Sequence, residues 1–255
     1  MINAIRRFGL LVGTGAILAS PPLHAAGEHH WSYSGETGPA QWAALESDYS
    51  VCGIGKLQSP IDIRDSAAAK GPLPAIAFDY KPSPLKIVDN GHTIQVDYAP
   101  GSFITVHGMR YELVQFHFHK PSEERINGKS ADMVAHLVHK NADGNLAVVA
   151  VLLNTGHANK LVETLWKNLP PEKEREAAVE GVQVNAADLL PAKKAGYYTF
   201  TGSLTTPPCS EGVTWFVLKT PTSISNSEVA RFAQLYPMNA RPTQPLNGRE
   251  IRATP

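Results

Sequence analysis

The chain has 255 residues, and its 43% hydrophobic and 18% charged residues are typical of a globular protein with a sizeable core. Its 23 Lys and Arg residues balance its 23 Asp and Glu residues. A balanced charge lacks the clustered basic surface that nucleic-acid binding needs, so we expect no nucleic-acid partner.

The N-terminus has the pattern of a secretory signal. Arg6 and Arg7 precede an apolar run at 8–19, and a polar break follows. The apolar run is too short to span a membrane, and no later segment approaches the ~20 apolar residues that a spanning helix needs. We therefore predict an exported protein without a membrane span.

Small residues at Ala25 and Ala26 offer a cleavage site for this leader. The sequence therefore predicts a signal peptide at 1–26 and one domain at 27–255. In a Gram-negative bacterium this domain would be periplasmic, and otherwise it would be secreted.

The two cysteines, Cys52 and Cys209, also bear on whether the protein is exported. An even number of cysteines in an exported protein favours a disulfide, and with two the connectivity is forced if both pair within the chain. The alternative is two free buried thiols, which an oxidising compartment disfavours.

The middle of the chain alternates apolar and polar residues between turn signals such as Asn90-Gly91, which predicts a series of β-strands. Strands are expected at 85–89, 92–98, 103–107, 110–120, 132–140 and 146–153.

Two stretches have helical spacing instead. The first covers 157–169 and ends at a Pro-Pro pair, and the second covers 229–236 after a capping-box pattern from Ser225 to Glu228. The combination predicts a mainly β (α+β) fold in a single domain.

Three histidines lie on the predicted strands. His117 and His119 are spaced i, i+2, so on a strand both face one side, and His136 lies on the strand at 132–140. If the two strands pair, three imidazoles can meet at one point. Three neutral imidazoles leave a tetrahedral zinc ion one open position, which is the catalytic arrangement. Single strand histidines are more often hydrogen-bonded core or surface residues, and His-x-His occurs in other β-rich metalloproteins, so the spacing predicts a metal before it predicts a reaction.

A series of motifs along the chain resembles the α-class carbonic anhydrases of the bacterial, exported type. The motifs occupy 30–33, 38–42, 58–63, 90–92, 115–119, 136–139, 203–209, 211–215 and 239–242. This resemblance implies a large, twisted, mostly antiparallel sheet with a few short helices and with zinc at the base of a conical cleft.

The resemblance also implies an activity, the zinc-dependent, reversible hydration of carbon dioxide to bicarbonate and a proton. Zn²⁺ would be held by His117, His119 and His136, and zinc-bound hydroxide would attack carbon dioxide. His92 would be the proton shuttle, because an imidazole titrates near neutral pH. The small-molecule partners would be carbon dioxide, water and bicarbonate, and the protein would be a monomer or a homodimer.

Further site residues follow from the same resemblance. Thr205, donating to Glu123, would orient the hydroxide, and Tyr33 and Asn90 would order the connecting waters. Gln115 would accept from His117, and the backbone carbonyl of Asn239 would accept from His119. The positions that match the carbon dioxide pocket and cleft are Val138, Val148, Leu204, Val213, Trp215, Gln95 and Thr206.

The sequence departs from the family pattern next to the third histidine. The residue two positions before it is usually an acid that accepts from the imidazole, whereas this chain has Val134. Our hypothesis is that water or another group holds His136 and that zinc binds more weakly than in relatives. Glu124 and Lys120 replace a histidine and an aromatic residue, and we expect both to be tolerated loop variation.

Two other functions fit parts of the pattern. One is a non-catalytic zinc-binding module on the same scaffold, and the other is an exported metal-binding or storage protein. All three histidines are present together with Thr205 and Glu123, which favours the enzyme.

Overall fold

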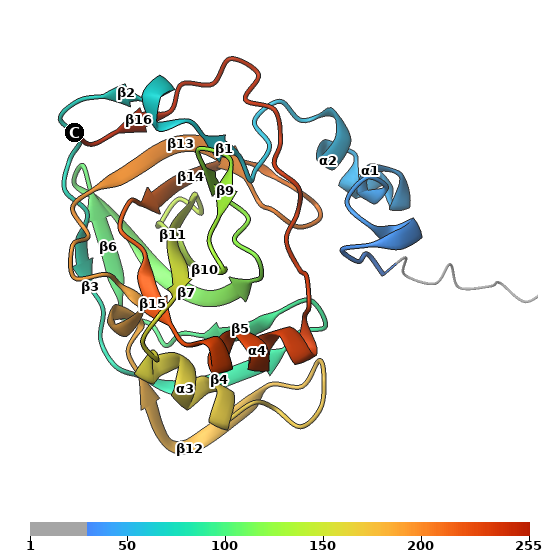
Figure 1. The fold of residues 1–255 in the computed structure, drawn as a ribbon, viewed down its shortest axis with the longest axis vertical. Coiled ribbons are helices and arrows are strands. Elements are labelled where there is room, and N and C mark those ends of the chain that lie inside the picture. The colour runs from blue at the N-terminus through green and yellow to red at the C-terminus, as the bar shows by residue number, and fades with distance from the viewer. Residues whose placement is uncertain (1–29) are drawn as a thin grey trace, which may run out of the picture.

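The computed structural model describes residues 30–255, so the predicted signal peptide lies outside the described residues (Figure 1). Most of the strands form one sheet of 13 strands, and β1, β8 and β9 form a small separate sheet. The strands are β1 (Asp62–Ile63), β2 (Ala69–Lys70), β3 (Ala77–Asp79), β4 (Ser83–Asp89), β5 (Ile94–Asp97), β6 (Phe103–Val106), β7 (Met109–His119), β8 (Arg125–Ile126), β9 (Lys129–Ser130), β10 (Met133–Lys140), β11 (Leu146–Thr155), β12 (Ala177–Val184), β13 (Tyr197–Ser203), β14 (Glu211–Leu218), β15 (Thr222–Ile224) and β16 (Arg252–Ala253).

The helices are short and lie around the sheet (Figure 1). The α-helices are α1 (Trp42–Leu45), α2 (Val51–Ile54), α3 (Lys160–Lys167) and α4 (Asn226–Leu235), and the 3₁₀ helices are η1 (Gly35–Thr37), η2 (Ser47–Tyr49), η3 (Asp65–Ala67) and η4 (Ala186–Leu189). No helix among residues 30–255 is long and apolar enough to cross a membrane.

The main path of the large sheet runs β12-β4-β5-β7-β10-β11-β14-β13-β16-β2. Neighbours from β12 to β11 are antiparallel, while β11 pairs with β14 and β15 in parallel, and β16 pairs with β2 in parallel. The sheet curls around its central strands (Figure 1). The predicted mainly β fold around a large, mostly antiparallel sheet is therefore confirmed.

Each face of the sheet carries its own hydrophobic core, because successive side chains on a strand point to opposite sides. The larger core contains Phe116 and Phe118 of β7, together with Trp166 of α3 and Phe232 of α4. The smaller core, on the other face, contains Val134, Val148, Val213, Trp215 and their neighbours. The central strands β10 and β11 are therefore covered on both sides, while β7 packs in the larger core on one side.

The predicted strands between 85 and 153 correspond to β4, β5, β6, β7, β10 and β11. The predicted helix at 157–169 is α3, which begins later than expected because the side chain of Asn159 accepts from the backbone of Leu161 and Val162. The expected capping box opens α4, where Ser225 and Glu228 each bind the other's backbone N–H. The pattern did not predict β12, β13 or β14.

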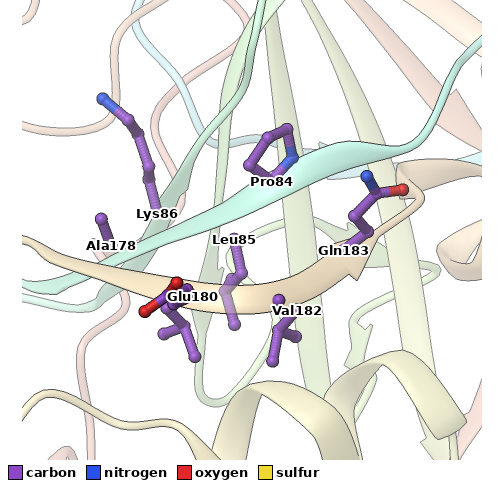
Figure 2. A pocket seen from close by; sticks show the side chains of 9 residues that line it. Pro84, Leu85, Lys86, Ala178, Glu180, Val182 and Gln183 are labelled. Atoms are coloured by element: carbon purple, nitrogen blue, oxygen red, sulfur yellow. The ribbon is translucent and has the colours of Figure 1, made fainter.

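A surface hollow lies along β4 and β12, at one edge of the sheet (Figure 2). The ladder between these strands is irregular between Ala178 and Gln183. The lining residues come only from 84–86 and 178–183, so the hollow contains none of the predicted site residues.

Candidate metal centre

The three histidines meet on one face of two paired strands. His136 of β10 is the direct partner of His117 of β7, and His119 lies two residues further along β7. Phe116 and Phe118, which alternate with these histidines along β7, point to the opposite face, into the larger core. One nitrogen atom from each imidazole lies within 4.8 Å of the other two, so the three residues could hold a metal ion.

The other ring nitrogen of each β7 histidine is hydrogen-bonded away from this centre. Nδ1 of His117 lies 2.8 Å from Oε1 of Gln115, and Nδ1 of His119 lies 2.8 Å from the backbone oxygen of Asn239. Carbonyl oxygens only accept, so both histidines donate from Nδ1 and direct the lone pair of Nε2 inward. Gln115 and Asn239 therefore lie where the sequence placed them.

His136 has the opposite arrangement, and its partner is a residue that the sequence analysis assigned to loop variation. Nε2 of His136 lies 3.0 Å from Oε1 and 3.2 Å from Oε2 of Glu124. We expected Glu124 to be tolerated loop variation, and the sequence did not predict its contact with His136. Val134 is buried in the smaller core and cannot accept a hydrogen bond. The carboxylate comes from the segment after β7 rather than from β10.

The chemistry of His117 and His119 fits a bound cation. Nε2 of His119 is buried and has no hydrogen-bond partner, which is costly for a polar atom that nothing else satisfies. Burial lowers the pKa of His117 to about 3 and the pKa of His119 well below its usual range. Both imidazoles are therefore neutral at pH 7, which is the form that coordinates metals.

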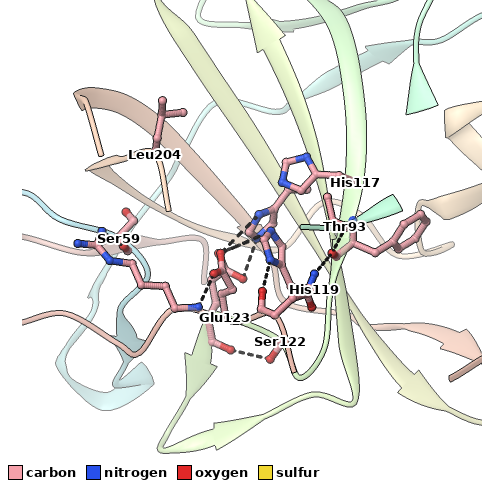
Figure 3. A network of polar contacts seen from close by, with 12 residues as sticks. Ser59, Thr93, His117, His119, Ser122, Glu123 and Leu204 are labelled. Carbon is pink, nitrogen blue, oxygen red and sulfur yellow. Dashed lines mark hydrogen bonds and ion pairs between the residues drawn. The ribbon is translucent and has the colours of Figure 1, made fainter. Parts of the chain in front are cut away.

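Glu123 and Thr205 lie together beside the histidines. Oε2 of Glu123 is 3.6 Å from Nε2 of His119, and Oε1 accepts from the backbone N–H of Arg241 at 2.7 Å (Figure 3). Burial raises the pKa of Glu123 to about 7, while His136, the side chain of Thr205 and the Arg241 backbone act to lower it. Thr205 is buried in the turn between β13 and β14.

Arg241 is a structural residue of the site that the sequence analysis did not single out. Its buried guanidinium donates to Oε1 of Gln58, to the backbone oxygen of Ser59 and to the backbone oxygen of Cys52. Because its backbone also holds Glu123, this one residue joins the N-terminal segments to the metal centre. The sequence feature that could have identified Arg241 as a site residue was its place in the motif at 239–242.

His92 lies in the turn between β4 and β5. Its ring stacks on Trp31 with 3.6 Å between centroids, and His30 stacks on it at 4.7 Å. Burial, and then the nearby His30 and Lys173, lower the pKa of His92 to about 4. This differs from the near-neutral value expected for a free imidazole, because the aromatic stack removes water from the ring.

The other predicted polar residues flank this turn. The side-chain oxygen of Asn90 accepts from the backbone of His92 and Thr93, and its Nδ2 atom donates to Gln95 at 3.3 Å. Gln95 is the cross-strand neighbour of His117. Tyr33 packs edge-on against Trp31 at 5.4 Å, and burial raises the pKa of its hydroxyl well above its usual value.

The apolar residues predicted for the pocket form one group on the histidine face. The ring of Trp215 lies 4.9 Å from that of His136. Val148 is the cross-strand partner of both Val138 and Trp215. The members of this group in the smaller core are Val138, Val148, Leu204, Val213 and Trp215.

Cys52 and Cys209 form a disulfide with their Cα atoms 5.0 Å apart, which confirms the predicted pairing. The backbone N–H of Cys209 donates to the carbonyl of Thr206, so the disulfide fixes the turn that carries Thr205. Trp42 packs against the two cysteines.

Three inward-facing imidazoles on a mixed β-sheet, beside buried carboxylates, define a protein of the three-histidine zinc class. The sequence model of the eukaryotic-type carbonic anhydrase family matches residues 37–255 of this chain. The chain therefore belongs to this carbonic anhydrase family, which supports both the expected enzyme class and zinc as its cofactor.

Individual relatives agree with this assignment. A carbonic anhydrase from Klebsiella pneumoniae is 44% identical over 225 residues, which cover 87% of this chain and 90% of the relative. A hyperthermostable carbonic anhydrase from an active hydrothermal vent chimney is 48% identical, with a TM-score of 0.85, over 89% of this chain and all of that one. The α-carbonic anhydrase of Thermovibrio ammonificans, solved with the inhibitor sulfanilamide, is 40% identical with a TM-score of 0.82 over 89% of this chain and all of that one.

Proposed function

We propose that this protein is an exported zinc enzyme that converts carbon dioxide and water reversibly into bicarbonate and a proton. The observation that carries the proposal is the geometry of the three imidazoles. Their inner nitrogens lie within 4.8 Å of one another, and their outer nitrogens are each held by a hydrogen-bond acceptor.

Nε2 of His117, Nε2 of His119 and Nδ1 of His136 would hold the zinc ion. Zinc would act as a Lewis acid that lowers the pKa of a coordinated water to about 7, the value known for carbonic anhydrases as a class. The three protein ligands leave the fourth position for that water.

Thr205 and Glu123 would fix the orientation of the reacting water. A hydroxyl has one proton, so a Thr205 hydroxyl that donates to Glu123 presents only lone pairs to its other neighbour. Thr205 then has to accept from the water, which turns the lone pair of the water oxygen toward carbon dioxide. The backbone N–H of Arg241 helps to hold Glu123 in place.

The apolar residues beside the histidines suit carbon dioxide, which is small and uncharged. Trp215 lies against His136, and Val148 joins Trp215 to Val138 across three strands. Leu204 and Val213 belong to the same cluster. This wall would admit carbon dioxide while offering water no hydrogen-bonding partner.

Each turnover releases one proton, which has to leave the site. His92 would carry it, with Tyr33, Asn90, Gln95 and Thr206 ordering the water that connects His92 to the metal centre. In the stacked position the pKa of His92 is about 4, so transfer would require the ring to leave Trp31. We also propose that the metal centre lies at the base of a conical cleft.

Export is the part of the proposal that concerns location. The disulfide between Cys52 and Cys209 is compatible with an oxidising compartment, where such bonds persist. The signal sequence at 1–26 would direct the chain there.

The deciding experiment is stopped-flow hydration of carbon dioxide by the purified protein, after chelation, and after zinc is restored. We expect activity to disappear with the metal, to return with zinc and to be inhibited by sulfanilamide, the inhibitor present in the Thermovibrio structure. A folded, zinc-loaded protein without activity would instead indicate a non-catalytic zinc-binding module.

A further inference from the structure

We propose that Glu124 is the positioning residue for His136, in the role that the family resemblance implied for an acid at position 134. The inference rests on the zinc site proposed above. The key juxtaposition is a buried carboxylate from the segment after β7 against the outer nitrogen of a histidine on β10.

The contact is closed to water and well fixed. Glu124 and His136 each have 1% of their surface exposed, and both carboxylate oxygens are within hydrogen-bond distance of Nε2. Ser122 holds the segment, because its hydroxyl donates to the backbone oxygen of Glu124 and accepts from the backbone of Ala131. The carboxylate therefore has little freedom to leave the histidine.

The carboxylate determines which nitrogen of His136 faces the metal. A carboxylate accepts from Nε2–H, so the lone pair is placed on Nδ1 and the imidazole becomes a better ligand. Val134 is two residues before His136 and shares its face, yet its side chain packs in the smaller core and offers no acceptor. Glu124 therefore supplies the only carboxylate against this nitrogen among the described residues.

An acid at each of the two positions would be unfavourable. Both carboxylates would be buried around a single N–H donor, and like charges in a buried site repel each other strongly. The valine at 134 and the glutamate at 124 therefore belong together as one exchange. As a result, two consecutive carboxylates contact the proposed ligands. Glu123 lies beside His119, and Glu124 lies beside His136.

The test measures zinc affinity of the folded apo-protein by competition with a chelator, for the wild type, four variants of the site and one control variant. We expect Glu124→Ala to weaken zinc binding about 10–100-fold and Glu124→Gln, which keeps a neutral acceptor, to weaken it less. Val134→Glu alone should also weaken binding, because of the second buried charge. Glu124→His combined with Val134→Glu should restore affinity above that of Glu124→Ala. Glu180→Gln, on the exposed surface of β12, is the matched control.

A second measurement separates positioning from folding. In the zinc-loaded protein the Nε2–H proton of His136 should give a protected, downfield NMR resonance that Glu124→Gln shifts and Glu180→Gln leaves unchanged. Folded Glu124→Ala with wild-type zinc affinity would overturn the inference, as would a double variant that binds no better than Glu124→Ala. Zinc binding by the wild type without hydration of carbon dioxide would overturn the proposed function alone.

Discussion

His117 and His136 are direct cross-strand partners in the ladder between β7 and β10. Their ring centroids are 5.5 Å apart, and the far face of both strands packs in the larger core. The spacing of two candidate ligands is thus set by backbone hydrogen bonds and not by a loop. A site built on paired central strands keeps its geometry before a ligand arrives, which lowers the cost of binding.

Thr205→Val tests the proposed orientation of water. Valine keeps the shape of threonine and removes the hydroxyl that faces Glu123. We expect hydration of carbon dioxide to fall about 100-fold, the typical effect of losing one oriented hydrogen bond at a reacting centre. Zinc affinity should not change, because Thr205 is not a proposed ligand.

Glu123→Gln should have a similar effect, and the double variant should lose little more than either single variant, since both residues act through one hydrogen bond. Thr201→Val, exposed on the same β13 strand, is the control and should keep full activity. Full activity in Thr205→Val would contradict the assigned role.

The disulfide should contribute both stability and order at the site. It closes a segment with a sequence separation of 157 residues, for which chain entropy predicts a stabilisation of about 5 kcal/mol as an upper limit. We expect Cys52→Ser combined with Cys209→Ser to lower the urea midpoint and also the activity, because Cys209 ends the turn that carries Thr205. Reductant should reproduce the effect in the wild type and change nothing in the double variant. A reduced wild type of unchanged stability would contradict this expectation.

The periodicity of the sequence predicted the part of the site that lies on strands. The alternation of His117 and His119 with two phenylalanines placed the imidazoles on one face, and the structure agrees. This succeeded because side-chain direction on a strand depends only on position, and the core on the far face fixes the register.

The contacts made by irregular segments could not be predicted in the same way. Glu124 reaches His136 from a turn, and Arg241 reaches Glu123 from a segment 118 residues away in sequence. No period relates such residues, because the path of a loop depends on the tertiary contacts at its ends. β12 was also missed, because most of its residues are exposed and its alternation breaks at Gly181.

His92 offers a test that depends on pKa. Burial is the first cause of its lowered pKa of about 4, and Trp31 is the ring stacked on it. We expect an NMR titration to give a midpoint near this value and Trp31→Ala to move the midpoint upward, toward about 6.5 for a free imidazole. A wild-type midpoint near that of a free imidazole would show that the ring leaves the stack in solution.

The activity of His92→Ala tests the same residue as a proton carrier. We expect turnover in dilute buffer to fall about 10–100-fold, because proton transfer through a positioned group is lost, while concentrated imidazole buffer should restore it. The zinc affinity and the urea midpoint of unfolding of His92→Ala should match those of the wild type. His157→Ala, an exposed histidine outside the site, is the control. Undiminished turnover in dilute buffer would assign the proton transfer to another group.

His139 should make the stability of the fold dependent on pH. It is fully buried, its Nε2 atom lies 2.7 Å from the hydroxyl of Tyr80, and its Nδ1 atom lies 3.3 Å from the backbone oxygen of Ala147. Because that oxygen only accepts, His139 donates from Nδ1 and accepts from Tyr80, which requires a neutral ring. Burial lowers its pKa to about 3.

The unfolded chain therefore binds this proton more readily than the folded protein between about pH 6.5 and pH 3. The contribution of neutral His139 is complete above pH 6.5 and is lost as the pH falls through this window. We expect the free energy of unfolding of the wild type to drop relative to His139→Gln by up to about 1.4 kcal/mol per pH unit. Urea unfolding of the zinc-loaded proteins from pH 7 to pH 4 measures this difference, with His157→Gln as the exposed control. A constant difference between wild type and His139→Gln across that range would mean that the buried ring does not titrate with folding.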